Sequence, residues 1–62
     1  MAIREVVVLP YGDGMFEKEF VADTEADKDS IDTSNLLMGS GVYVIDTTNT
    51  YILNGSKEWR LM

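Results

Sequence analysis

Residues 41–62 read GVYVIDTTNTYILNGSKEWRLM and contain three short apolar runs divided by two polar segments. Valine, isoleucine and tyrosine dominate the run at 42–45, and these residue types favour extended backbone. The segments at 46–49 and 54–57 are rich in the residues that form turns, and Asn54-Gly55 is a common hairpin signal. This stretch therefore predicts a three-stranded C-terminal β-meander over residues 41–62.

Large apolar side chains occupy alternate positions on the three predicted strands. Because alternate residues of a strand share one face, we predict that the aromatic residues Tyr43, Tyr51 and Trp59 stack across neighbouring strands as core aromatics. The same alternation brings three aliphatic side chains to that face, namely Ile45, Leu53 and Leu61. A carbohydrate-binding platform is the alternative interpretation of the three rings.

The N-terminal third of the chain predicts a hairpin. Residues 3–9 are rich in β-branched side chains on both faces, which indicates a strand covered on both sides, and Pro10 ends it because proline cannot donate to a ladder. The two glycines of residues 11–14 predict a turn that leads into a second strand over residues 15–21. Phe16 and Phe20 also fit one face of a helix, but the preceding turn favours a strand.

Residues 23–35 form an acidic segment with five carboxylates and one basic residue. Thr24 and Asp27 could cap one helical turn, yet the run is short and polar, and we predict a mobile loop or one ordered by a neighbouring subunit. The alternating carboxylates begin like a calcium loop, but Lys28 stands where such a loop needs glycine and Ser34 where it needs glutamate. The sequence therefore predicts no metal site in this segment.

These patterns together predict one small all-β domain over residues 1–62. We expect a sheet or barrel-like arrangement of four to five short strands. An N-terminal strand and hairpin would be joined by the acidic loop 23–35 to the C-terminal meander 41–62.

The composition argues against several functional classes. The chain has 62 residues and lacks both cysteine and histidine, so a disulfide and a zinc site lack their usual residues, and the serines lack a histidine to activate them. We therefore expect neither an enzyme nor a cofactor. The net charge of −6 predicts repulsion from nucleic acid and from anionic membranes, and the apolar runs are too short to span a bilayer. No signal-peptide pattern precedes the first strand, which predicts synthesis and retention in a cytoplasm.

The segment from Gly39 to Leu61 resembles a β-meander found in small virion proteins of tailed bacteriophages. The shared pattern is a glycine-serine start, a strand, Asp46-Thr47, a tyrosine-containing strand, Asn54-Gly55 and a tryptophan-containing strand. The resemblance implies a structural protein of the virion, a capsid decoration or head-fibre type module, commonly trimeric, that binds the major capsid protein or another virion protein. No heptad or collagen-like stretch is present for a fibre shaft, which favours a capsid-surface module made in the host cytoplasm.

Two other functions stay open. An acidic inhibitor could mimic nucleic acid with the carboxylates of residues 23–32, although a net charge of −6 is modest for such a mimic. A carbohydrate-binding module would use the three aromatic residues of the meander.

A domain of this size buries only about 60% of the surface of its unfolded chain and needs additional stabilisation. Without disulfides or zinc, we predict that association between chains supplies this stabilisation, as a homo-oligomer with a trimer as the favoured state. The predicted interface residues are exposed apolar candidates that together could form one patch, although Val6 and Val8 could instead cover the meander: Val6, Val8, Leu36, Leu37, Met38, Ile52 and Met62.

Overall fold

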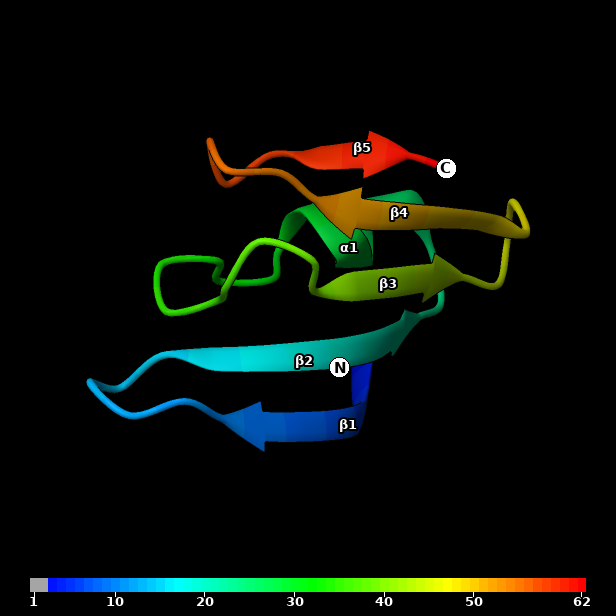
Figure 1. Cartoon of the computed structure of the whole chain (residues 1–62). Helices are drawn as coiled ribbons and strands as arrows, with labels where there is room; N and C mark the ends of the chain where they lie inside the picture. The colour runs from blue at the N-terminus through cyan, green and yellow to red at the C-terminus, as the bar shows by residue number, and fades with distance from the viewer. Residues whose placement is uncertain (1–2) are drawn as a thin grey trace.

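The computed structural model describes residues 3–62, so Met1 and Ala2 of the predicted domain lie outside the described residues. Five strands and one short helix follow one another along the chain (Figure 1). Their bounds are Ile3–Pro10 (β1), Phe16–Ala22 (β2), Glu25–Asp29 (α1), Gly41–Val44 (β3), Asn49–Leu53 (β4) and Trp59–Leu61 (β5). The strands form one open sheet in the order β1-β2-β3-β4-β5, which confirms the predicted small all-β class.

The N-terminal hairpin forms where the sequence predicts it. β1 and β2 pair antiparallel, and the turn between them contains three consecutive residues with positive φ: Gly12, Asp13 and Gly14. Glycine and aspartate adopt this conformation at low cost, and the Tyr11 N–H closes the turn by donating to the Met15 carbonyl at 3.0 Å. The helical alternative for the second run is therefore wrong.

The C-terminal meander is also present, with β4 paired antiparallel to both β3 and β5. The second turn differs in detail from a two-residue Asn-Gly hairpin. Asn54 stands at its first corner, where its Oδ1 accepts the backbone N–H groups of Ser56 and Glu58, both at 2.9 Å. Lys57 takes the positive φ of 65°, as in a type I turn followed by a bulge residue.

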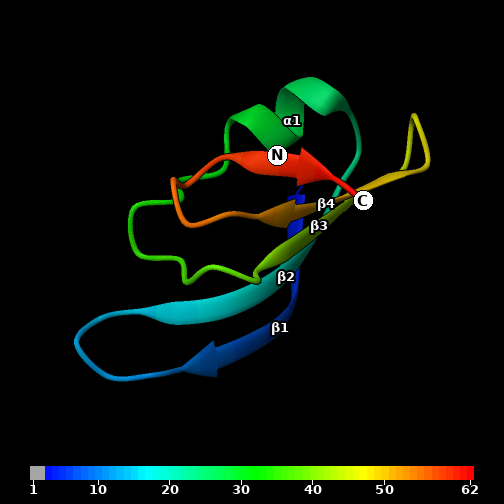
Figure 2. The same cartoon turned by 45° about the horizontal axis from the view of Figure 1, so that its top comes forward.

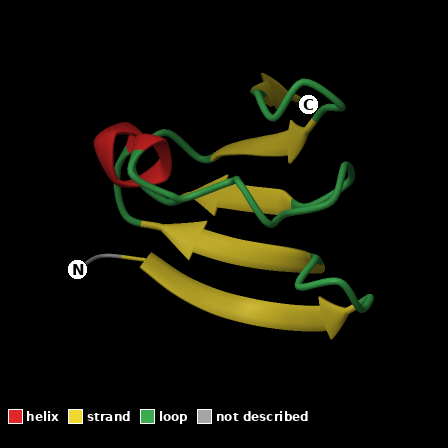
Figure 3. Cartoon of the chain, turned by 90° about the vertical axis from the view of Figure 1, so that its left-hand side faces the viewer, coloured by secondary structure: helices red, strands yellow, loops and turns green. Residues whose placement is uncertain are grey.

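The two halves join through a parallel pair that the sequence did not predict. β2 runs parallel to β3, and a parallel connection needs a crossover of a dozen residues or more, which residues 23–40 provide. α1 lies on one side of the sheet (Figure 2), and residues 35–40 then return to the sheet, where the backbone of Phe16 bonds to residues 35 and 37 and that of Leu53 to residues 39 and 40. The other side has no covering element among the residues described, and Figure 3 shows the single helix beside the strands.

The core lies between the sheet and the crossover. Its buried apolar side chains are Phe20, Ala22, Leu36, Val42, Val44 and Leu53, with Ile3, Ile31, Tyr51 and Trp59 packed against them. Trp59 meets Phe20 edge to face at a centroid distance of 6.5 Å. Few large side chains are fully buried, as expected for so short a chain.

Two predictions about the faces of the strands are wrong. β1 is an edge strand that is not covered on both sides: Val8 is exposed on the crossover side, and Val6 and Leu9 are exposed on the opposite side, which no other element covers among residues 3–62. On β3, Val42 and Val44 face the core, whereas Tyr43 and Ile45 are exposed, the reverse of the predicted alternation. Both faces of this strand are apolar, so periodicity could not choose between the two registers.

The acidic segment contains a short helix where the sequence predicts a loop. α1 occupies residues 25–29, and Thr24 and Asp27 cap it reciprocally: Thr24 Oγ1 accepts the Asp27 N–H, and Asp27 Oδ2 accepts the Thr24 N–H, both at 3.2 Å. Ile31 then packs against the core. Tertiary contacts stabilise a turn too short to be stable alone.

Candidate interaction surface

The uncovered side of the sheet, called the open face below, presents six apolar side chains. Paired residues of neighbouring strands point to the same side, so the strand register defines this face. Its apolar members are Val6, Val7, Leu9, Val21, Tyr43 and Ile52. Val6 is 57% exposed, and Tyr43 and Ile52 are each 40% exposed, so this is apolar surface in contact with water.

A shallow hollow of about 180 Å³ lies near the middle of the open face. Val6, Glu19, Val21, Tyr43 and Thr50 surround it, and Gly41 lies among them without a side chain. A Cβ atom at Gly41 would meet only the Tyr51 carbonyl oxygen, at 3.6 Å, so the space above this glycine is empty. The face therefore offers a recess beside the projecting side chain of Ile52, its neighbour on β4.

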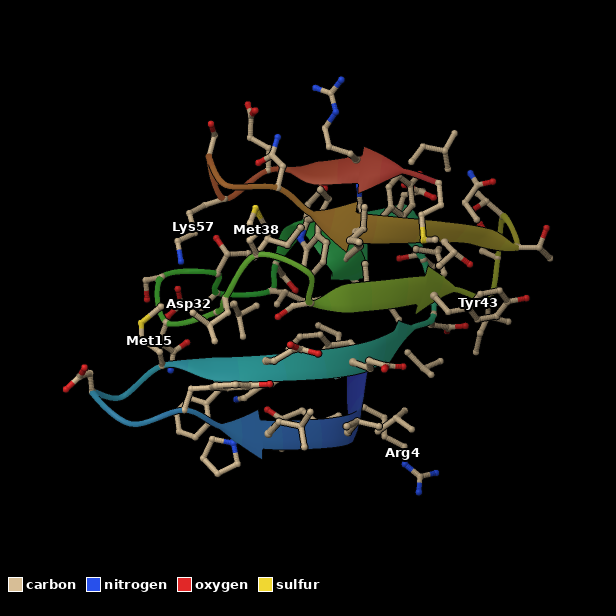
Figure 4. All side chains as sticks on the ribbon, in the orientation of Figure 1. Arg4, Met15, Asp32, Met38, Tyr43 and Lys57 are labelled. Atoms are coloured by element: carbon tan, nitrogen blue, oxygen red, sulfur yellow. The ribbon has the colours of Figure 1, made fainter. Side chains whose placement is uncertain are left out.

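Four charged strand residues lie on the same face, and their charges cancel. Arg4 lies on β1, Glu17 and Glu19 lie on β2, and Arg60 lies on β5. Within residues 3–62 none of the four makes an ion pair in the monomer. Figure 4 shows Arg4 and Tyr43 at the same end of the sheet. Glu58, which directly precedes β5 and alternates with Trp59, adds one negative charge to this side of the sheet.

The predicted interface residues do not form one patch. Val6 and Ile52 are on the open face, and Met62 follows β5 with its N–H bonded to the Thr50 carbonyl at 2.9 Å. Val8 is paired with Lys18 and points to the opposite side. Leu36 was also predicted as an interface residue, and this prediction is wrong because its side chain is buried in the core.

The apolar run 36–38 has three different environments. Leu36 is buried because the Phe16 and Leu37 backbones hold the crossover against the start of β2, with the Leu37 N–H donating to the Phe16 carbonyl at 2.8 Å. Leu37 is half-buried, and Met38 is exposed near Lys57 (Figure 4). This run therefore completes the core at one end and reaches solvent at the other.

The three predicted core aromatics are also divided between the two sides. Tyr51 and Trp59 pack against the core, but Tyr43 lies on the open face and is not a core residue. The rings consequently do not form one platform on which a sugar could stack, because the sheet separates Tyr43 from the other two.

A polar cluster that the sequence did not reveal anchors α1 to the meander. Glu25 accepts hydrogen bonds from the Tyr51 hydroxyl, at 2.8 and 2.9 Å to its two oxygens, and from Thr47 Oγ1 at 2.7 Å. The Lys28 ammonium lies 4.1 Å from the centre of the Tyr51 ring and 3.5 Å from Glu25 Oε1. The partners are 22 and 26 residues from Glu25 in the chain, so only the crossover brings them together.

Hydrogen bonding sets the ionisation of this cluster. The bonds from Thr47 and Tyr51, aided by the charge of Lys28, lower the pKa of Glu25. Burial acts to lower the pKa of Lys28, but its hydrogen bond with Asp29 and the charges of Asp29 and Glu25 raise it overall. Both groups are thus held in their charged forms, which suits an anchor rather than an acid or base that must exchange a proton near neutrality.

Three of the other four acidic side chains of the segment are also used internally. Asp27 caps α1, Asp29 pairs with Lys28 at 3.3 Å, and Asp32 Oδ1 accepts the Ser34 N–H at 3.0 Å, which lowers the pKa of Asp32. Across residues 3–62 the structure contains no group of three or more side chains suited to hold a metal ion. The carboxylates therefore stabilise local structure instead of projecting as a row.

A second hollow, of about 530 Å³, opens on the crossover side between β1, β2 and residues 31–35. Its charged rim is an ion pair between Lys18 Nζ and Glu5 Oε1 at 3.0 Å, together with Asp32. Because it is open and its cation is already paired, it lacks the buried, converging polar groups of a small-molecule site.

No family model, curated protein or solved structure matches this chain in the three comparisons made.

Within the described part of the chain, no helix has the length and apolar character needed to cross a membrane.

Proposed function

We propose that this chain is a non-catalytic assembly module that associates with copies of itself through the open face. The single observation that carries the proposal is a five-stranded sheet with one side packed as a core and the other side apolar, recessed and exposed. Contiguous exposed apolar surface on a small domain is typical of an interaction site.

The small core supplies the energetic reason for association. A chain of this length leaves a large share of its surface in water, and burial of the open face in a second copy adds apolar contacts that the monomer lacks. The open face also carries less charge than the chain as a whole, because its four strand charges cancel and Glu58 adds one negative charge, against a net charge of −6 for the chain. Association and folding stability are then linked by mass action.

The wider setting of this module follows from the resemblance of residues 39–61 to small virion proteins of tailed phages. We place it as a capsid-associated auxiliary protein of the decoration or head-fibre type, with the major capsid protein or another virion protein as its partner. The rival functions have less support: four of the five acidic side chains of residues 23–35 are engaged in internal contacts, and the aromatic rings lie on two sides of the sheet.

The self-association is tested by sedimentation of the full chain from about 1 to about 500 µM, with thermal melts at each concentration. We expect a mass above the 7.0 kDa of one chain and a melting temperature that rises with concentration. Tyr43→Ser should weaken association, whereas the matched Tyr11→Ser, in the β1–β2 turn, should not. A monomer with a constant melting temperature would refute the proposal.

The virion setting has a separate test. Protein analysis of purified phage particles would show whether the chain is a virion component, and the neighbouring genes would show whether it is encoded beside a major capsid protein. Absence of the chain from such particles, or neighbours that belong to host defence, would instead support the inhibitor.

A further inference from the structure

The strand register gives the open face an internal symmetry. One row of paired residues crosses it as Glu19 on β2, Gly41 on β3, Ile52 on β4 and Arg60 on β5. About the line between β3 and β4, the recess at Gly41 mirrors the projecting Ile52, and an acid mirrors a base. Across β2 to β5, each position is therefore balanced by its complement on the other side of this line, whereas β1, which carries Val7 beside Glu19, has no counterpart and extends past the balanced strands.

The adjacent row has the same property. Val21 on β2 and Tyr43 on β3 are followed by Thr50 on β4, whose carbonyl accepts the N–H of Met62 beyond β5. The outer positions, Val21 and Met62, are both apolar, and the inner ones place the Tyr43 ring opposite a small side chain.

From this pattern we infer that two copies pair face to face about a two-fold axis that runs along the strands above the line between β3 and β4. Such an axis places β3 opposite the partner's β4 and β2 opposite the partner's β5, and leaves β1 at the edge of the interface. A two-fold interface uses the same patch twice, so every contact below occurs in duplicate. The inference rests on the proposed self-association and specifies its geometry.

The contacts that follow are complementary in shape and charge. Ile52 enters the hollow above the partner's Gly41, while Glu19 approaches the partner's Arg60. Val21 meets the partner's Met62, an apolar pair. Packed sheets interdigitate in this way at a separation of about 10 Å, with strands nearly aligned.

One end of the face is less favourable and provides a further check. Glu58 precedes Trp59 and Arg60, so strand alternation directs it to the open side, and the same axis brings Glu17 toward the partner's Glu58. This like-charge pair weakens the dimer. Its removal should therefore strengthen association instead of reducing it.

The axis is tested by sedimentation of full-length variants with a charge swap. Glu19→Arg and Arg60→Glu should each raise the dimer dissociation constant about tenfold or more, because each places two like-charge pairs in the interface. The double variant should restore it to within about threefold, since the pairs are re-formed with reversed polarity. Asp29→Arg makes the same charge change as Glu19→Arg on α1, away from the open face, and should have no comparable effect.

Two further variants test the shape and the unfavourable pair. Gly41→Val fits a strand and fills the hollow, so it should weaken the dimer without unfolding the chain, as checked by circular dichroism. Glu58→Lys should tighten it a few-fold.

The outcomes separate this geometry from the broader proposal. A mass of two chains, with rescue by the double swap, supports the axis. An oligomer whose dissociation constant is unchanged by the charge swaps and by Gly41→Val would overturn the two-fold axis but leave self-association intact. The trimer implied by the phage resemblance would do the same. A wild-type chain that stays monomeric overturns both.

Discussion

Ser40 is the one buried polar side chain among residues 3–62, and its replacement by alanine tests how the two halves of the sheet are joined. It directly precedes β3, where the parallel pairing with β2 begins. Its hydroxyl donates to the Leu37 carbonyl at 2.9 Å and accepts the Lys18 backbone N–H at 3.2 Å. The side chain thus continues the parallel ladder by one more hydrogen bond.

The loss of unfolding free energy in Ser40→Ala follows from the hydrogen bonds that each partner of the Ser40 hydroxyl retains. The Leu37 carbonyl keeps the Ser40 N–H at 3.2 Å, so only a bond worth about 0.5–1.5 kcal/mol is lost there. The Lys18 N–H loses its acceptor, and an unsatisfied partly buried donor costs about 1–3 kcal/mol. The expected loss is about 1.5–4.5 kcal/mol, against a total stability of roughly 3–9 kcal/mol for a domain of this size.

The assay is urea denaturation followed by the fluorescence of Trp59, which packs against Phe20 in the core. All variants are compared at one protein concentration, because association also contributes to stability. Ser56→Ala, in the exposed turn before β5, is the control and should change stability by less than about 0.5 kcal/mol. If Ser40→Ala were equally harmless, the argument that this hydroxyl secures the parallel junction would fail.

Three further perturbations concern the crossover and the turns. Thr24→Ala removes the cap of α1 and should cost about 1 kcal/mol in the same denaturation assay; no loss would mean that the cap is dispensable. The folded-state pKa of Glu25 lies below its ordinary 4.5, so its contribution to stability is present above that value and declines as pH falls through the folded pKa. Glu25→Gln should therefore reduce the loss of stability at acid pH. An unchanged stability–pH profile would exclude Glu25 as a source of that loss. Thr48 has a φ of 57°, unfavourable for a β-branched residue, so Thr48→Asn should raise the melting temperature by an amount equivalent to about 0.5–1 kcal/mol, and a lower value would contradict this source of strain.

The open face was only partly predictable from the sequence. Val6 and Ile52 were predicted as interface residues, and both lie on it. Tyr43 was assigned to the core because it alternates with Ile45 as regularly as Val42 does with Val44. Which pair is buried depends on the position of the crossover, and that position is not encoded in the periodicity of β3 itself.

The anchor of α1 shows a second limit of sequence reasoning. The capping pair Thr24 and Asp27 is a local signal and was visible as such, but its strength in isolation was too low to predict a helix. Glu25 gains its hydrogen bonds from Thr47 and Tyr51, residues of the distant meander. The free energy that keeps the helix folded is therefore supplied by partners that no local pattern could identify.

The sequence by itself determined the class of the domain, the two hairpin-type regions and their turns, because β-branched runs and glycine or asparagine turn signals act over a few residues. Only the tertiary structure decided the parallel pairing of β2 with β3, the burial of Leu36 and the side on which each strand faces water. These features arise when residues 23–40 cross one side of the sheet. Once that side is covered, the apolar residues of the other side are left exposed, and they form the surface through which we propose that the chain assembles.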